Sequence, residues 1–321
     1  IGTWRGEVGR GELGGRIVCY LTGPEVVEGG HRMEDGRCNR ALWPVVPVCL
    51  VLRFSESGYY KHLPAQGRPD RDAEVLELIY GLLREDEENL NYGVRRIYEY
   101  LRLNKGYTGG MHRISRICRE HGLLIRRKRR SHGITRADQT AQKSENLLRQ
   151  DFTATAPNQK WLCDITQVPC RDGKLYLCAI LDCYDGSIRG FHMDDNMRSE
   201  LCIQAFQNAW KEDGAHGMIF HSDRGSQFTS HAFRAALRLC GARQSMSSTG
   251  RCYDNARMES FFATLKKEKL YRLDTRQLSM AEVKSIIFRY IHYYNRRRIY
   301  SSNGGLPPLI FRRAFYSAAA A

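Results

Sequence analysis

The chain has 321 residues, with 50 Lys and Arg against 35 Asp and Glu and a net charge of +15. This length allows two or three domains, and the basic excess favours a polyanionic partner, either nucleic acid or an anionic membrane surface. No apolar run of about 18 residues occurs, so the sequence predicts no membrane span and favours nucleic acid as the partner. We therefore expect a cytoplasmic protein.

The 11 cysteines raise the alternatives of disulfides and zinc. They are scattered from Cys19 to Cys252 through apolar stretches, and no CxxC pair occurs, so the spacing of a zinc site is missing. We interpret them as reduced thiols and expect Cys163, Cys178 and Cys202 in the core.

The N-terminal half begins with a segment without a pattern and continues as short helices. Residues 1–47 are Gly-rich and lack periodicity, so we assign them no fold and expect disorder. Apolar residues at helical spacing predict helices at about 48–63, 71–84, 93–103 and 111–121. Joined by Gly-containing turns, these indicate a helix-turn-helix-like DNA-binding region over 48–130.

A basic run ends this region. It consists of Arg126, Arg127, Lys128, Arg129 and Arg130. A solvated linker is one interpretation of such a run, but its position directly after a helix-turn-helix-like pattern favours contact with phosphates. The polar residues 131–157, which end in Pro157, are predicted to form a linker.

The pattern changes to an α/β domain over residues 158–270. Short β-rich segments at 161–168, 174–182 and 187–193 are separated by Asp-Gly turns. A helix at 198–211, a strand at 217–221, a helix at 229–240, a strand at 243–246 and a helix at 254–269 follow. This order predicts a mixed sheet flanked by helices. Residues 271–321 add a helix at 279–295 and a tail.

Three carboxylates stand out by their position. Asp164 lies within an apolar strand, where a charge is costly without a partner. Asp223 follows the apolar strand that ends at Ser222, and Glu259 opens a helix. Acids that converge from separate elements at one sheet edge need cations between them, and oxygen ligands select Mg²⁺ or Mn²⁺. The pattern therefore favours a site of two ions for phosphoryl transfer.

Other residues near these acids have plainer interpretations. We expect Asp182 to have a structural role or to contact the residues that bind the metal without binding it. We expect Asp254 to cap a helix N-terminus. His221 is expected to orient the strand end rather than bind metal, and Trp161 to lie in the core.

Three blocks carry a resemblance to a known family. They are WLCDIT (161–166), HSDRGSQFTS (221–230) and GRCYDNARMESFFATLKKE (250–268), and 35 residues lie between Asp223 and Glu259. With SESGYYKH (55–62) and NYGVRRI (91–97), they resemble the OrfB-type transposases of the IS-three insertion-sequence family, which have a retroviral-integrase-like DDE core. The likeness covers roughly residues 48–310.

The resemblance implies an RNase H-like catalytic core preceded by the helical domain. It implies metal-dependent cleavage at transposon ends and transfer of the 3′-hydroxyl into DNA, with Asp164, Asp223 and Glu259 as catalytic metal ligands. Lys266, two helical turns after Glu259, and Lys267 are expected to contact DNA. The implied partners are terminal inverted repeats, target DNA, further copies of the chain and an OrfA protein, and the implied location is the bacterial nucleoid.

Some features depart from the family pattern. The stretch RRRIYSSNGGLPP (296–308) lacks the usual His, and residues 1–47 lack the helix-turn-helix and zipper segment of the fused full-length transposase. Two alternatives therefore stay open: a nuclease of the same fold that does not join DNA, and a DNA-binding protein without catalysis.

Overall fold

The computed structural model describes residues 7–13, 16–22, 55, 57, 72–124, 144–213, 216–247 and 252–319. The chain divides into two units, Ile1–Ala73 and Glu74–Ala321. In the first unit, β1 (Glu7–Leu13) pairs antiparallel with β2 (Arg16–Thr22), with Glu7 opposite Thr22. The sequence pattern predicts no element there; the β-branched and aromatic residues at 17, 18 and 20 suit a strand. The helix expected at 48–63 lies outside the described residues, apart from Ser55 and Ser57.

The second unit begins with a small helical domain. Its elements are α3 (Ala73–Glu85), the 3-10 turn η2 (Glu87–Asn91), α4 (Val94–Asn104) and α5 (Met111–Glu120). The apolar faces of the helices meet in a core that includes Ile79, Ile97 and Ile114, all fully buried. These three helices confirm the predictions at 71–84, 93–103 and 111–121.

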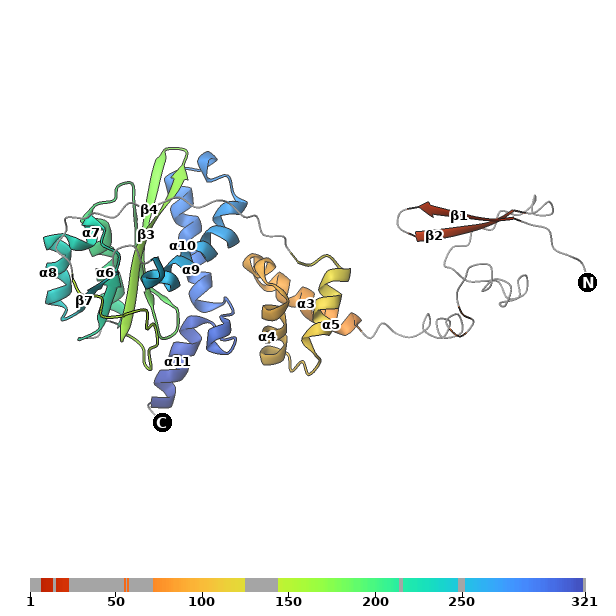
Figure 1. Cartoon of the computed structure of the whole chain (residues 1–321), viewed down its shortest axis with the longest axis horizontal. Coiled ribbons are helices and arrows are strands. Elements are labelled where there is room, and N and C mark those ends of the chain that lie inside the picture. Colours follow the sequence, from red (N-terminus) through yellow and green to blue (C-terminus); the bar gives the residue numbers. More distant parts are fainter. Residues whose placement is uncertain are drawn as a thin grey trace, which may run out of the picture. The chain divides into compact units, whose positions relative to one another are not determined.

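A mixed sheet of five strands follows (Figure 1). Its strands are β3 (Lys160–Cys170), β4 (Gly173–Asp182), β5 (Ile188–Asp194), β6 (Ile219–Ser222) and β7 (Arg243–Met246), in the order β5-β4-β3-β6-β7. The first three strands form an antiparallel meander, while β6 and β7 run parallel to β3. Gly173 and Gly186 adopt positive φ in the two predicted Asp-Gly turns, a conformation that glycine adopts at least cost.

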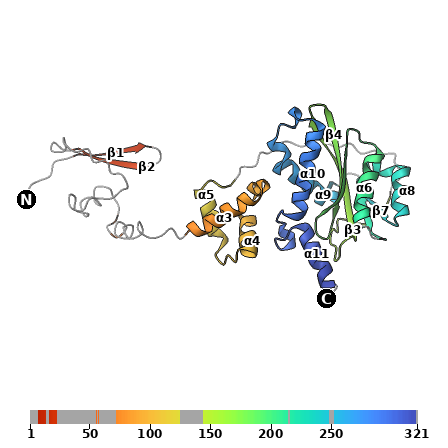
Figure 2. The ribbon, with the colours of Figure 1, turned by 180° about the vertical axis from the view of Figure 1, so that it is seen from behind.

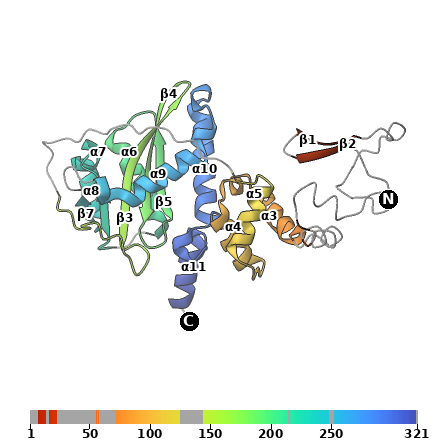
Figure 3. The same ribbon diagram turned by 45° about the vertical axis from the view of Figure 1, so that its right-hand side comes forward.

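Helices cover both faces of the sheet (Figures 1 and 2). One face packs against α6 (Ser199–Asp213), α7 (Ser226–Thr229) and α8 (His231–Leu239) in a core with Trp161, Phe206 and Phe220. The other packs against α9 (Ala256–Glu268) and α10 (Met280–Arg296) in a core with Leu162 and Leu177. Because side chains alternate along a strand, neighbouring residues such as 161 and 162 enter different cores. Figure 3 shows α9 crossing the sheet.

This architecture confirms the predicted mixed sheet flanked by helices and preceded by a helical domain. It differs in detail from the sequence pattern. The helix expected at 229–240 is broken at Ser230, whose side chain caps α8, and the helix expected at 254–269 begins with the 3-10 turn η3 (Cys252–Asn255). The C-terminal helix α11 (Pro308–Ala319) was not expected, because Gly and Pro residues before it suggest a tail; Pro308 is its first residue, where a missing N–H costs nothing. None of the helices in the described ranges has the length and apolar content of a membrane span.

Candidate active site

Strand register places Asp164 and Asp223 at the same edge of the sheet. The parallel pairing of β3 with β6 sets Leu162 opposite His221, and β6 ends at Ser222. Asp164 and Asp223 are each two residues further along these parallel strands, which lie about 4.8 Å apart. Both carboxylates therefore emerge where the pairing of the two strands has ended.

Glu259 reaches this edge from α9. It lies in the first turn of the helix and is exposed, while its neighbour Met258 is fully buried. The helix start is anchored to the strand that carries Asp164, because Asn255 donates its side-chain amide to the Cys163 carbonyl at 3.1 Å. Sequence reasoning assigned Asn255 no role, although its position directly before the helix was visible.

The three acids influence one another. Burial and the charges of Asp223 and Glu259 together raise the pKa of Asp164 to about 7, against the lowering effect of a hydrogen bond from the Ile165 backbone amide at 2.8 Å. Burial also raises the pKa of Asp223, opposed by a hydrogen bond from the Gly225 amide at 2.9 Å. The structure therefore brings the three predicted acids within electrostatic reach of one another.

The basic side chains that the structure describes do not neutralise the three acids directly. None of the three acids forms an ion pair with a basic side chain within the described residues. Lys266 acts on the acids only through its charge, which lowers the pKa of Asp164. Burial lowers the pKa of Lys266 itself. Lys266 is half-buried, and Lys267 is exposed.

The donor set fits a divalent cation, although the acids do not form a closed cage. In the described part of the chain, no three His, Cys, Asp or Glu side chains stand together at metal-ligand spacing. An all-oxygen set suits Mg²⁺ or Mn²⁺, and uncompensated carboxylates favour a bound cation.

The rival acids Asp182 and Asp185 have other partners. The Arg312 guanidinium donates to Asp185 at 2.6 Å and also to Asp182, and the Asn158 amide donates to Asp182 at 2.8 Å. Both carboxylates are fully buried. They hold α11 against the sheet, which agrees with the structural role expected for Asp182.

Of the other residues interpreted near the acids, Trp161 and His221 agree with the sequence prediction and Asp254 does not. Trp161 is fully buried in the core, as predicted. The two ring nitrogens of His221 form hydrogen bonds with the hydroxyls of Ser245 at 2.8 Å and Ser247 at 3.1 Å. His221 therefore orients the strand end, as expected. The expected N-cap role of Asp254 is wrong: Asn255 occupies that position, and Asp254 is buried and accepts a hydrogen bond from Asn146 at 2.9 Å.

The basic and thiol groups complete the comparison with the sequence. Arg126, Arg127, Lys128, Arg129 and Arg130 lie outside the described residues. Cys163, Cys178 and Cys202 are free and buried, as expected. A residue that the sequence did not flag is Arg257, which donates to the Phe152 carbonyl at 3.2 Å and to the Cys183 carbonyl and so ties the first turn of α9 to the sheet.

Known protein families match most of the chain. Two models described as integrase core domain match residues 154–252 and 240–308, and one described as HTH-like domain matches residues 69–131. The catalytic core domain of HTLV-2 integrase, solved in complex with magnesium, is 19% identical with a TM-score of 0.42 and covers 50% of this chain and 99% of its own.

Two bacterial relatives are similar over nearly their whole length. The 31 kDa protein of insertion element IS600 from Shigella sonnei is 37% identical over 280 residues, which cover 85% of this chain and 100% of that protein. Transposase InsF of insertion sequence IS3A from Escherichia coli K12 is 32% identical, covering 84% of this chain and 94% of InsF. The chain therefore belongs to the IS-three family of transposases, DDE-type enzymes that cleave DNA and transfer its strands with an integrase core.

Proposed function

We propose that Asp164, Asp223 and Glu259 are the catalytic acids with which this transposase cleaves the ends of its element and joins the freed 3′-hydroxyl to target DNA. One observation carries this proposal. The parallel register of β3 and β6 brings two half-buried, like-charged carboxylates to the same sheet edge, and α9 brings a third acid within electrostatic reach of Asp164. Carboxylates that repel one another are stabilised by a bound cation.

The same three acids would hold two Mg²⁺ or Mn²⁺ ions. When bound, such ions supply Lewis-acid activation of the attacking oxygen and stabilise the leaving 3′-oxygen. The chain orients the ligands beforehand, since the Ile165 and Gly225 amides each hold one carboxylate oxygen of Asp164 and Asp223. Gly225 suits this position because a Cβ there would lie 3.1 Å from Asp223 Oδ1 and 2.9 Å from Gln227 Oε1.

DNA binding follows from family membership and the helix-turn-helix-like domain, and the finer assignment is part of our proposal. The terminal inverted repeats would be held through Arg126, Arg127, Lys128, Arg129 and Arg130, and the phosphates near the cleaved bond through Lys266 and Lys267. We propose that the protein acts as a homo-oligomer on DNA, with an OrfA protein as a further partner, in the cytoplasm at the nucleoid.

A joining assay tests the activity. A labelled duplex carrying the terminal repeat that flanks the gene is incubated with an unlabelled plasmid and Mg²⁺, Mn²⁺ or EDTA. We expect metal-dependent nicking at the 3′ end of the repeat, followed by transfer of label to the plasmid. Nicking without transfer would instead support a nuclease of the same fold, and binding without either reaction would support a DNA-binding protein without catalysis.

A further inference from the structure

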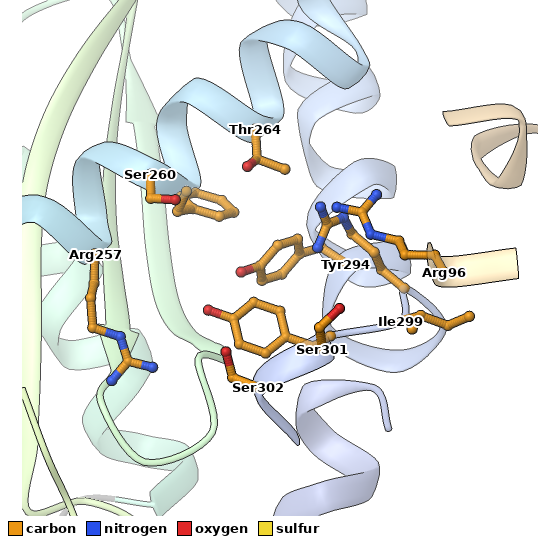
Figure 4. A pocket seen from close by; sticks show the side chains of 11 residues that line it. Arg96, Arg257, Ser260, Thr264, Tyr294, Ile299, Ser301 and Ser302 are labelled. Atoms are coloured by element: carbon orange, nitrogen blue, oxygen red, sulfur yellow. The ribbon is translucent and has the colours of Figure 1, made fainter. Parts of the chain in front are cut away.

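A polar cavity of about 250 Å³ lies between α9 and the segment that follows α10 (Figure 4). Ser260 and Thr264, one helical turn apart on α9, face Ser301 and Ser302, and Arg257 and Arg96 stand at opposite sides. The lining is mostly hydroxyl and guanidinium groups, which are donors that proteins direct at phosphate oxygens. Neither the acids nor the lysines of the proposed function line it.

The cavity carries a surplus of positive charge. Arg298 and Arg96 share a single carboxylate, that of buried Glu268, to which they donate at 2.8 and 3.1 Å. Arg257 donates only to two carbonyl oxygens and pairs with no carboxylate among the described residues. Three guanidinium groups therefore face one carboxylate. Among the described residues, Glu99 also hydrogen-bonds to the lining: it accepts from Ser301 at 3.0 Å and is itself paired with Arg95 at 3.0 Å.

Several donors in the cavity are unused. The hydroxyls of Ser260, Thr264 and Ser302 make no side-chain hydrogen bond within the described residues. A hydroxyl on a helix can bond to the carbonyl four residues earlier, as Ser285 does with Ala281 at 3.1 Å. Because Ser260 and Thr264 do not, their donors are available to a ligand.

The position of the cavity relates it to the reaction. Ser260 is the residue after Glu259, so the proposed acid and the cavity share the first turn of α9. Consecutive residues of a helix point about 100° apart, so a DNA strand with one phosphate at the acids would have to follow the surface of α9 to bring a second phosphate to the cavity. We propose that the cavity binds a backbone phosphate of the DNA strand held at the acids and thereby fixes the strand along α9. This inference rests on the proposed function, and it adds a phosphate site that uses hydroxyl and guanidinium groups rather than lysines.

The test measures how much each single phosphate of the DNA contributes to binding, with and without the cavity hydroxyls. The full chain and the double variant Ser260→Ala, Thr264→Ala are titrated without divalent metal against a duplex carrying the element's terminal repeat. A series of duplexes places one uncharged methylphosphonate at each position near the cleavage point. Alanine favours the helix, so the variant should fold. Ser285→Ala, an exposed serine on α10, is the matched control.

We expect the double variant to weaken binding of the unmodified duplex by roughly tenfold, the effect of losing hydrogen bonds to a charged group. One methylphosphonate should weaken the full chain to a similar extent and the double variant hardly at all. Ser302→Ala should reduce the effect of the same methylphosphonate. The control should respond like the unaltered chain.

Other outcomes overturn the inference. If every methylphosphonate weakens the unaltered chain and the double variant by the same factor, the cavity holds no backbone phosphate. If inorganic phosphate at matched ionic strength raises the melting temperature of the unaltered chain but not of the double variant, while no methylphosphonate position is coupled, the cavity takes free phosphate instead. Metal-dependent cleavage of the unmodified duplex, measured in parallel, reports separately on the proposed function.

Discussion

Two groups of acids lie at the ends of sheet strands and differ in whether the fold gives them a cation. Asp182 and Asp185, at the end of β4, are fully buried and share the guanidinium of Arg312. Asp164 and Asp223, just beyond the β3–β6 pairing, are half-buried and repel each other without an ion-pair partner among the described residues.

The difference distinguishes acids that stabilise the fold from the acids that we propose to be catalytic. Burying a carboxylate is costly, and a protein usually offsets that cost with a cation of its own. Where the fold supplies Arg312, the acids stabilise the native state. Where the described part of the fold supplies no ion-pair partner, the acids repel one another until a cation binds, which is the arrangement expected of a metal-dependent site.

The largest expected effect is on cleavage. Asp164→Asn, Asp223→Asn and Glu259→Gln should each lower the cleavage rate by about 10³-fold or more, roughly 4 kcal/mol of barrier, because an amide is a poor metal ligand. Duplex affinity without metal should stay within about twofold, since it depends on Lys and Arg. Single-turnover cleavage and filter binding measure the two quantities. Cleavage at the unaltered rate by any variant would remove that residue from the site.

The paired group should show the reverse pattern. Arg312→Met leaves two carboxylates buried without a cation and should lower the free energy of unfolding by about 3–5 kcal/mol. Adding Asp182→Asn and Asp185→Asn should restore much of the loss. Urea unfolding measures both, with Arg313→Met, at an exposed neighbour, as control. A cost for Arg312→Met no larger than that of the control would show that this group does not stabilise the fold.

The pH dependence of stability sharpens the contrast at Glu268. Burial alone would raise its pKa, but the hydrogen bonds and charges of Arg298 and Arg96 outweigh burial and lower the pKa to about 2. A lowered pKa in the folded state stabilises above the unfolded value of 4.5, and this contribution is lost as pH falls toward 2. The loss is on the order of 3 kcal/mol.

Glu268→Gln should therefore flatten the fall in unfolding free energy between pH 4.5 and pH 2. Unfolding in urea at several pH values measures it. The exposed substitution Glu200→Gln serves as control. If the unfolding free energy falls with pH equally in Glu268→Gln and the unaltered chain, Glu268 does not cause the loss of stability at low pH.

The smallest expected effect concerns Lys266. Its charge reaches Asp164 but forms no ion pair there, so we expect it to contact the DNA backbone beside the acids. Lys266→Ala should weaken DNA binding several-fold and reduce the slope of log affinity against log salt by about 0.9. Lys174→Ala, at an exposed position on β4, is the control. If both variants give the same slope as the unaltered chain, Lys266 makes no phosphate contact.

The sequence could predict what depends on local pattern. Alternating and helical spacing located the strands and helices of the sheet domain, and the three motif blocks located Asp164, Asp223 and Glu259. The sequence could not predict hydrogen-bond and ion-pair partners that lie far apart along the chain. The residues around Arg312 do not indicate that it pairs with Asp185 and Asp182, which lie 127 and 130 residues earlier. Those around Arg257 do not indicate that it donates to the carbonyl of Cys183, 74 residues earlier. The cavity on α9 escaped for the same reason, because its hydroxyls become neighbours only when α10 and its following segment pack.

The pairing of Arg312 also has a consequence for synthesis. Asp182 and Asp185 leave the ribosome well over a hundred residues before their cation, and during that interval the sheet must either stay open to water or bury two uncompensated charges. The sheet domain can therefore complete its folding only after α11 has emerged. A translation product that stops before Arg312 should be a substrate for proteases rather than a shortened enzyme, so element activity would require nearly every codon through this helix to be read.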